Sequence, residues 1–153
     1  MAVTNNYVPY EPNSQGFVEA LIDLKDSLKS SEPNNIIGFE AIALENISQG
    51  EALYSRASDG KLGRATANST LDLATVIGFA ESAKSAGATA RAVVKGALAT
   101  SGLNPGDIYY LSTGAGGITT TVSSTAGHYI TRVGEAVNSG QLIINIEPPL
   151  LVS

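Results

Sequence analysis

Residues 101–136, SGLNPGDIYYLSTGAGGITTTVSSTAGHYITRVGEA, decide the fold of this chain. Short runs of aromatic and β-branched residues alternate here with glycine-containing turns. Branching at Cβ favours extended backbone, and four threonines lie between positions 119 and 125. This pattern predicts three strands joined by two turns.

An earlier part of the chain repeats this layout at one constant spacing, that between Gly50 and Gly106. Residues 49–54, QGEALY, align with residues 105–110, PGDIYY, and VIGFA at 76–80 aligns with RVGEA at 132–136. No gap is needed between the two pairs of segments. Internal similarity of this kind indicates a supersecondary unit that needs a neighbour to bury its apolar face.

We therefore predict a mainly β protein with two tandem similar β modules, residues 36–95 and 96–147, that form a small barrel or sandwich. In the first module we expect a strand over residues 71–80, with Gly78 at a bulge or a close backbone approach. A loop over residues 81–86 leads to a long strand over residues 88–99. The second module contains a strand over residues 128–137 and ends in the apolar run LIINI at 142–146.

The N-terminal part differs in pattern. Residues 1–13 hold two prolines and two tyrosines and are interpreted as an extended arm, either a frayed terminus or a strap laid over a partner. Residues 14–35 are interpreted as an amphipathic helix followed by a linker. The helix stripe is formed by Phe17, Leu21, Leu24 and Leu28. It would pack on its own β domain or join subunits in a short coiled coil.

Residues 148–153 form a C-terminal tail that begins with Pro148 and Pro149. Proline lacks an amide hydrogen, so the tail is not expected to continue inside a sheet. Apolar side chains beyond this stop are expected to rest on a protein surface, in this subunit or the next. The candidate partner-binding residues of the two arms are Tyr7, Val8, Tyr10, Leu150, Leu151 and Val152.

Composition limits the classes of partner. The net charge is −5 and only 15% of residues are charged, which argues against nucleic-acid binding and suits a protein covered by neighbours. The chain has no cysteine, so it has neither disulfides nor thiolate metal ligands. No basic start precedes an apolar run, and no apolar run is long enough to span a bilayer. We expect neither an export signal nor a membrane partner.

Candidate catalytic chemistry is sparse. The only histidine, His128, lies in a turn without a G-x-S-x-G motif or a nearby carboxylate, so a surface or interface histidine is expected. The glycines at 114–117 lack the lysine and helix of a phosphate-binding loop. Tyr109, Tyr110 and Tyr129 would form either a sugar platform or cross-strand packing. We predict no enzyme activity, no catalytic residues, no cofactor and no metal.

The segments at 102–112, 116–121 and 132–136 resemble a β module that recurs in structural proteins of tailed bacteriophages. Such modules occur in head fibres, tail fibres and capsid decoration proteins. The resemblance covers the last third of the chain. Because the chain lacks collagen-like repeats and a long coiled coil, it is more similar to a decoration, or cement, protein than to a fibre.

What the resemblance implies is a non-enzymatic virion protein that binds the outer surface of a phage capsid and stabilises it. The implied partners are the major capsid protein and further copies of the chain, in a homotrimer. Two alternatives stay open: a head or tail fibre attachment module, and a carbohydrate-binding module that uses the tyrosines.

Overall fold

The computed structural model describes residues 36–153. The expected arm at residues 1–13 and the expected helix and linker at 14–35 lie outside the described residues, as do Tyr7, Val8 and Tyr10.

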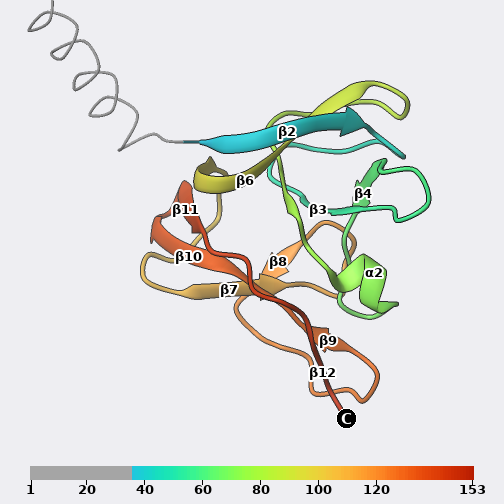
Figure 1. Cartoon of the computed structure of the whole chain (residues 1–153). Coiled ribbons are helices and arrows are strands. Elements are labelled where there is room, and N and C mark those ends of the chain that lie inside the picture. The colour runs from blue at the N-terminus through green and yellow to red at the C-terminus, as the bar shows by residue number, and fades with distance from the viewer. Residues whose placement is uncertain (1–35) are drawn as a thin grey trace, which may run out of the picture. The chain divides into compact units, whose positions relative to one another are not determined.

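The described part of the chain is mainly β, as predicted, and its large antiparallel sheet curls into a half-barrel (Figure 1). The elements are β2 (Ile37–Ile42), β3 (Ala52–Ser55), β4 (Leu62–Arg64), α2 (Leu71–Ala74), β5 (Gly78–Ala80), β6 (Thr89–Ala99), β7 (Ile108–Leu111), β8 (Ile118–Thr119), β9 (Tyr129–Ile130), β10 (Arg132–Asn138), β11 (Gln141–Ile144) and β12 (Leu150–Leu151). β12 and β9 form a separate two-stranded sheet.

The pairings of the large sheet follow one order in its two halves. The strand order is β4-β3-β5-β6-β11-β10-β7-β8, with β2 added on β6. From β4 inward, β4 pairs with β3, β3 with β5, β5 with β6 and β6 with β2. From β8 inward, β8 pairs with β7, β7 with β10, β10 with β11 and β11 with β6. β6 therefore belongs to both halves.

The residue partners agree as well. Tyr54 faces Gly63 across β3 and β4, and Tyr110 faces Thr119 across β7 and β8. Each residue of the second pair follows its counterpart at the spacing that relates Gly50 to Gly106. Leu53 facing Gly78 and Tyr109 facing Gly134 obey the same relation. The pairing of β2 with β6 is an exception. Its residue partners do not map, at this spacing, onto the partners that β6 forms with β11.

The glycines at 78 and 134 lie where two strands approach very closely. A Cβ atom on Gly78 would lie 2.8 Å from the carbonyl oxygen of Val93, and one on Gly134 would lie 2.3 Å from that of Ile143. Neither position has room for a side chain. The prediction of a close backbone approach at Gly78 is confirmed.

Two strands are shorter in the structure than predicted. Residues 71–74 form the short helix α2, so the strand predicted over residues 71–80 is reduced to β5. The Thr70 hydroxyl accepts a hydrogen bond from the Leu73 amide at 3.4 Å, which caps the helix start, and the Thr75 hydroxyl donates to the Leu71 carbonyl at 2.6 Å. These local side-chain bonds satisfy backbone groups and favour the turn of helix.

The strand predicted over residues 128–137 is interrupted at Thr131, between β9 and β10. Thr131 is fully buried, and its hydroxyl donates to the Ala74 carbonyl at 2.9 Å. Its own carbonyl accepts the Leu111 amide at 2.8 Å. The hydroxyl and the carbonyl of this interrupting residue thus both have partners inside the fold, as buried polar groups require.

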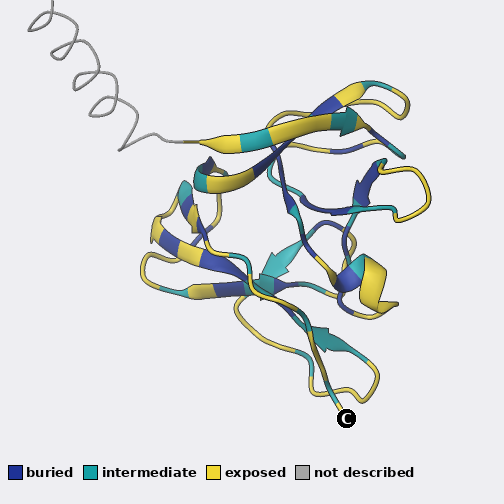
Figure 2. Ribbon diagram, in the orientation of Figure 1, coloured by how far each residue is buried: buried dark blue, intermediate teal, exposed yellow. Residues whose placement is uncertain are grey.

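The main core lies on the inner face of the half-barrel and draws on both halves. Its largest fully buried apolar members include Phe79, Val133 and Leu142. A second cluster, with Leu53 and Leu62, belongs to the first half alone. Figure 2 shows that burial is greatest where the strands meet, and that β2 and the segment containing β9 and β12 are largely exposed or half-buried.

Candidate protein-binding surface

The C-terminal residues form one strand of a small ribbon that leaves the body of the domain (Figure 1). In this ribbon, Leu150 pairs with Ile130 and Leu151 with Tyr129. The Val152 amide donates to the His128 carbonyl at 2.8 Å, and the Gly127 amide donates to the Val152 carbonyl at 2.8 Å. These backbone bonds fix the tail as a strand.

The ribbon is anchored at its base. The Tyr129 amide donates to the Ala67 carbonyl at 2.8 Å, and the half-buried Tyr129 side chain packs against the main core. The prolines at 148 and 149 end the pairing of the preceding chain with the large sheet, because they have no amide hydrogen to donate. The prediction that the tail would not continue inside a sheet is wrong, because Leu150 and Leu151 form β12 of the two-stranded sheet, where amides beyond the prolines find partners.

The two leucines of the ribbon carry the most exposed large apolar side chains of the C-terminal segment. Leu150 is 65% exposed and Leu151 is 55% exposed, whereas Val152 is half-buried. In a two-stranded ribbon fixed by main-chain bonds, such side chains present apolar area with little further loss of backbone freedom on docking. The structure thus places Leu150, Leu151 and Val152 together on one projecting element, which we call the ribbon surface.

His128 lies beside a polar hollow of about 380 Å³. Its Nδ1 atom is 2.7 Å from the Ser123 hydroxyl, a hydrogen bond between loop residues that the sequence did not reveal. Serine, threonine, leucine and valine side chains form the rest of the lining, and none of the lining residues is acidic. A serine-histidine-acid triad needs a carboxylate beside the histidine, and none lines this hollow among the described residues.

The tyrosines named as a sugar platform occupy different environments. Tyr109 is buried in the main core, and its hydroxyl accepts the Asn104 amide at 2.9 Å. Tyr110 and Tyr129 are half-buried on β7 and β9, in different sheets. No flat face made of the three rings is available for a sugar.

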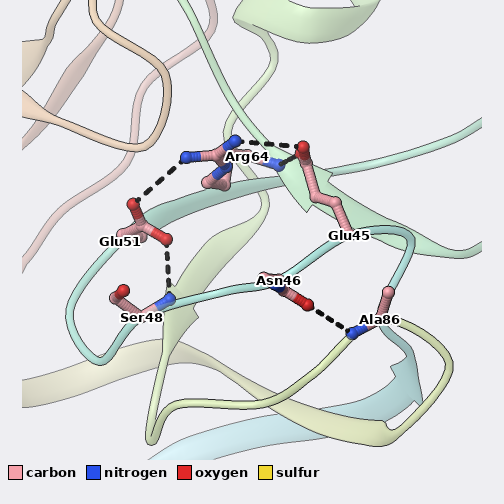
Figure 3. A network of polar contacts seen from close by, with 6 residues as sticks. All are labelled: Glu45, Asn46, Ser48, Glu51, Arg64 and Ala86. Carbon is pink, nitrogen blue, oxygen red and sulfur yellow. Dashed lines mark hydrogen bonds and ion pairs between the residues drawn. The ribbon is translucent and has the colours of Figure 1, made fainter.

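A polar network joins the loop before β3 to β4 (Figure 3). Glu45 accepts hydrogen bonds from the Arg64 amide at 2.8 Å and from its guanidinium at 3.2 Å. This hydrogen bonding, aided by the charges of Glu45 and Glu51, raises the pKa of the Arg64 guanidinium above its ordinary value. Glu51 also accepts the Ser48 amide at 2.7 Å.

The same network holds the neighbouring loop, because the Asn46 side chain accepts the Ala86 amide at 3.0 Å (Figure 3). Its carboxylates are occupied by arginine and backbone donors. The network thus acts as a brace for the loops of the first half.

Within residues 36–153 no group of three or more histidine, aspartate or glutamate side chains is placed to hold a metal ion. No helix of this same region is long and apolar enough to cross a membrane. No protein-family model matches the chain, and no curated protein sequence matches it.

Proposed function

We propose that the chain is a non-enzymatic protein that fastens other protein subunits together, and that its setting is the outer surface of a bacteriophage capsid, which it stabilises as a decoration protein. The observation that carries this proposal is the ribbon surface, where two leucines are held by main-chain bonds on an element that projects from the domain. The phage setting comes from the resemblance of residues 102–136 alone.

We further propose that residues 36–95 and 96–147 are tandem copies of one module. The equal order of pairings in the two halves supports this, as does the agreement of partners such as Leu53 with Gly78 and Tyr109 with Gly134. A scaffold of two halves with the same order of pairings is suited to positioning binding surfaces.

The mechanism of stabilisation follows from mass action. A protein that binds the assembled shell and not its separate subunits shifts the equilibrium toward the shell. Several copies that each contact more than one capsid subunit add avidity, provided that their geometry allows simultaneous contact. Modest contacts, such as two leucines per copy, are then sufficient to hold the protein on the shell.

The size of the ribbon contribution can be worked from its exposure. Burying a leucine completely is worth about 1.5 to 3 kcal/mol, and Leu150 and Leu151 still expose 65% and 55% of their surface. Neighbouring residues of a strand point to opposite faces, so a partner that covers both faces of the ribbon would gain about 2 to 3.5 kcal/mol per copy from the two leucines. This corresponds to a roughly 30- to 300-fold change in affinity.

The test is co-sedimentation of the full chain with shells assembled from the major capsid protein of the same phage. The double variant Leu150→Ser and Leu151→Ser should lose binding by about the factor given above. The matched control is Leu71→Ser on α2, because Leu71 is as exposed as Leu151 yet lies off the ribbon. Equal binding by the double variant and the control would refute the role of the ribbon surface.

A second arm of the same experiment examines the N-terminal candidates. Removal of residues 1–13, which contain Tyr7, Val8 and Tyr10, should weaken capsid binding if these residues form a strap.

Pull-down on polysaccharides tests the alternative of a carbohydrate-binding module, since a decoration protein should bind shells and not sugars. Sugar binding without shell binding would overturn the proposal.

A further inference from the structure

The polar hollow beside His128, which we call the His128 hollow, is lined mainly by hydroxyl groups. The end of β7 with the residues that follow it, strand β8, and the loop over residues 121–128 all contribute to it. At about 380 Å³ it has the size of a site for a small ligand, since ligand sites span roughly 300 to 1,000 Å³. Its hydroxyl-bearing residues are Ser112, Thr113, Thr119, Thr121, Ser123 and Thr125.

Two of these hydroxyl groups are held in place by backbone amides. Ser112 Oγ accepts the Gly114 amide at 3.0 Å, and Thr119 Oγ1 accepts the Thr121 amide at 3.1 Å. A hydroxyl that accepts a hydrogen bond still has its own proton to donate. Within residues 36–153 no protein group accepts the proton of Ser112 or Thr119. Both hydroxyls are therefore positioned donors without an acceptor.

His128 and Ser123 add two more donors to the hollow. The His128 Nδ1 atom is 2.7 Å from Ser123 Oγ, which also accepts the Thr125 amide at 3.2 Å. A hydroxyl oxygen can accept two hydrogen bonds, so Nδ1 donates to Ser123 when the imidazole carries both of its protons. The Ser123 proton and the His128 Nε2 proton then have no acceptor in the described part of the chain.

The charges near the hollow favour a negatively charged ligand. None of the lining residues is acidic, and the sheet face that carries Thr119 also carries an arginine. Thr119 pairs with Tyr110, and Tyr110 pairs with Arg132, so these three side chains form a row on one face. The Arg132 guanidinium lies 3.6 Å from a Glu147 carboxylate oxygen, and its Nε atom is buried without a partner in residues 36–153. The net charge of the whole chain is −5, so an anion would be attracted by this local arrangement alone.

A ligand that suits these groups must accept several hydrogen bonds and carry negative charge. A phosphate group does both, because its oxygens are strong acceptors for hydroxyl and imidazolium donors. A hard metal cation would instead need oxygen ligands such as carboxylates, and the lining has no carboxylate. We propose that the His128 hollow binds a phosphate group, either as the free ion or as an ester of a small polyol. The inference does not rest on capsid binding.

The single histidine of the chain makes the hollow directly observable. Proton NMR of the full chain is recorded at about pH 5.5, where an ordinary imidazole carries both protons. Addition of inorganic phosphate at constant pH should shift the imidazole signals and saturate in the millimolar range. Sodium chloride at matched ionic strength should not shift them. A response that does not saturate, or an equal response to chloride, would overturn the proposal.

Two substitutions from different segments test the donors. Ser123→Ala removes the partner of Nδ1 and one donor, and should weaken phosphate binding by about tenfold. Thr119→Val on β8 should weaken it by a similar factor. The matched control is Ser124→Ala, because Ser124 is exposed, adjacent to Ser123 and outside the lining. Circular dichroism checks that each variant is folded. Phosphate affinities of both variants equal to that of the control would overturn the proposal.

Glycerol phosphate and glycerol distinguish the two sources of the ligand. Glycerol phosphate should shift the His128 signals, and glycerol should not. Tighter binding of the ester than of inorganic phosphate would assign an esterified ligand, and the reverse order would assign the free ion; both results support the proposal. Binding of glycerol as tight as that of glycerol phosphate would overturn it, because the hollow would then recognise hydroxyl groups and not the phosphate.

Discussion

Substitution of Gly134 by alanine is expected to destabilise the protein strongly. The added Cβ atom would lie 2.3 Å from the Ile143 carbonyl oxygen, whereas ordinary contact begins near 3.4 Å. β10 and β11 would have to separate by about 1 Å, and both sides of the contact are backbone, which cannot rotate away. Overpacking of this kind costs about 1 to 3 kcal/mol, and we place this position near the upper end.

A smaller term acts in the opposite direction, since alanine reduces the freedom of the unfolded chain and stabilises by about 0.4 to 1 kcal/mol. The net loss is about 2 kcal/mol. For a chain of this size that lowers the melting temperature by roughly 6 to 8 °C. Urea unfolding followed by circular dichroism measures the free energy, and calorimetry measures the melting temperature.

The matched control is Gly114→Ala, in the exposed loop before β8. A Cβ atom there would meet only the Ser112 hydroxyl at 3.6 Å, so the change should be nearly neutral. Gly78→Ala should fall between the two, because its contact with the Val93 carbonyl is 2.8 Å. The reasoning fails if the loss at Gly134 is no larger than that at Gly114.

Three further changes test other parts of the structure. Thr131→Val should destabilise by about 1 to 2 kcal/mol in urea unfolding, because it leaves the buried Ala74 carbonyl without its donor; an unchanged midpoint would contradict this. The Arg56 hydrogen bond lowers the pKa of Asp59 to about 2, so its contribution to stability is complete above the unfolded pKa near 4 and disappears as the pH falls through 2. The stability difference between the protein and Asp59→Asn should therefore be small, present at pH 6 and largely lost at pH 2; a difference that grows on acidification would contradict this. His128→Ala should leave capsid binding unchanged, and a large loss would point to a functional role for the hollow beside Ser123.

Local signals were sufficient for much of the sheet. The long strand predicted over residues 88–99 is β6, and the loop predicted over residues 81–86 leads into it. Both features depend on residues adjacent in sequence. The helix α2 escaped prediction because Leu71 and Leu73 suit a strand as well as a helix, and the decisive capping bonds come from Thr70 and Thr75.

Features that depend on distant residues were not accessible to sequence reasoning. The break at Thr131 exists because the Ala74 carbonyl accepts its hydroxyl, and these residues are far apart in the chain. The Ser123 contact of His128 needs the fold of the intervening loop. Tyr109 was a candidate for sugar contact from its sequence, but packing of the surrounding strands buries it in the core.

The sequence by itself determined that this chain forms a mainly β structure, because alternation of apolar residues and turn glycines acts within a few residues. It also contained the spacing that relates Leu53 and Gly78 to Tyr109 and Gly134. Only the tertiary structure decided which apolar residues remain uncovered, among them those of β2 and the leucines of the ribbon surface. Exposure depends on what the rest of the chain packs against, and that is set by contacts between distant strands.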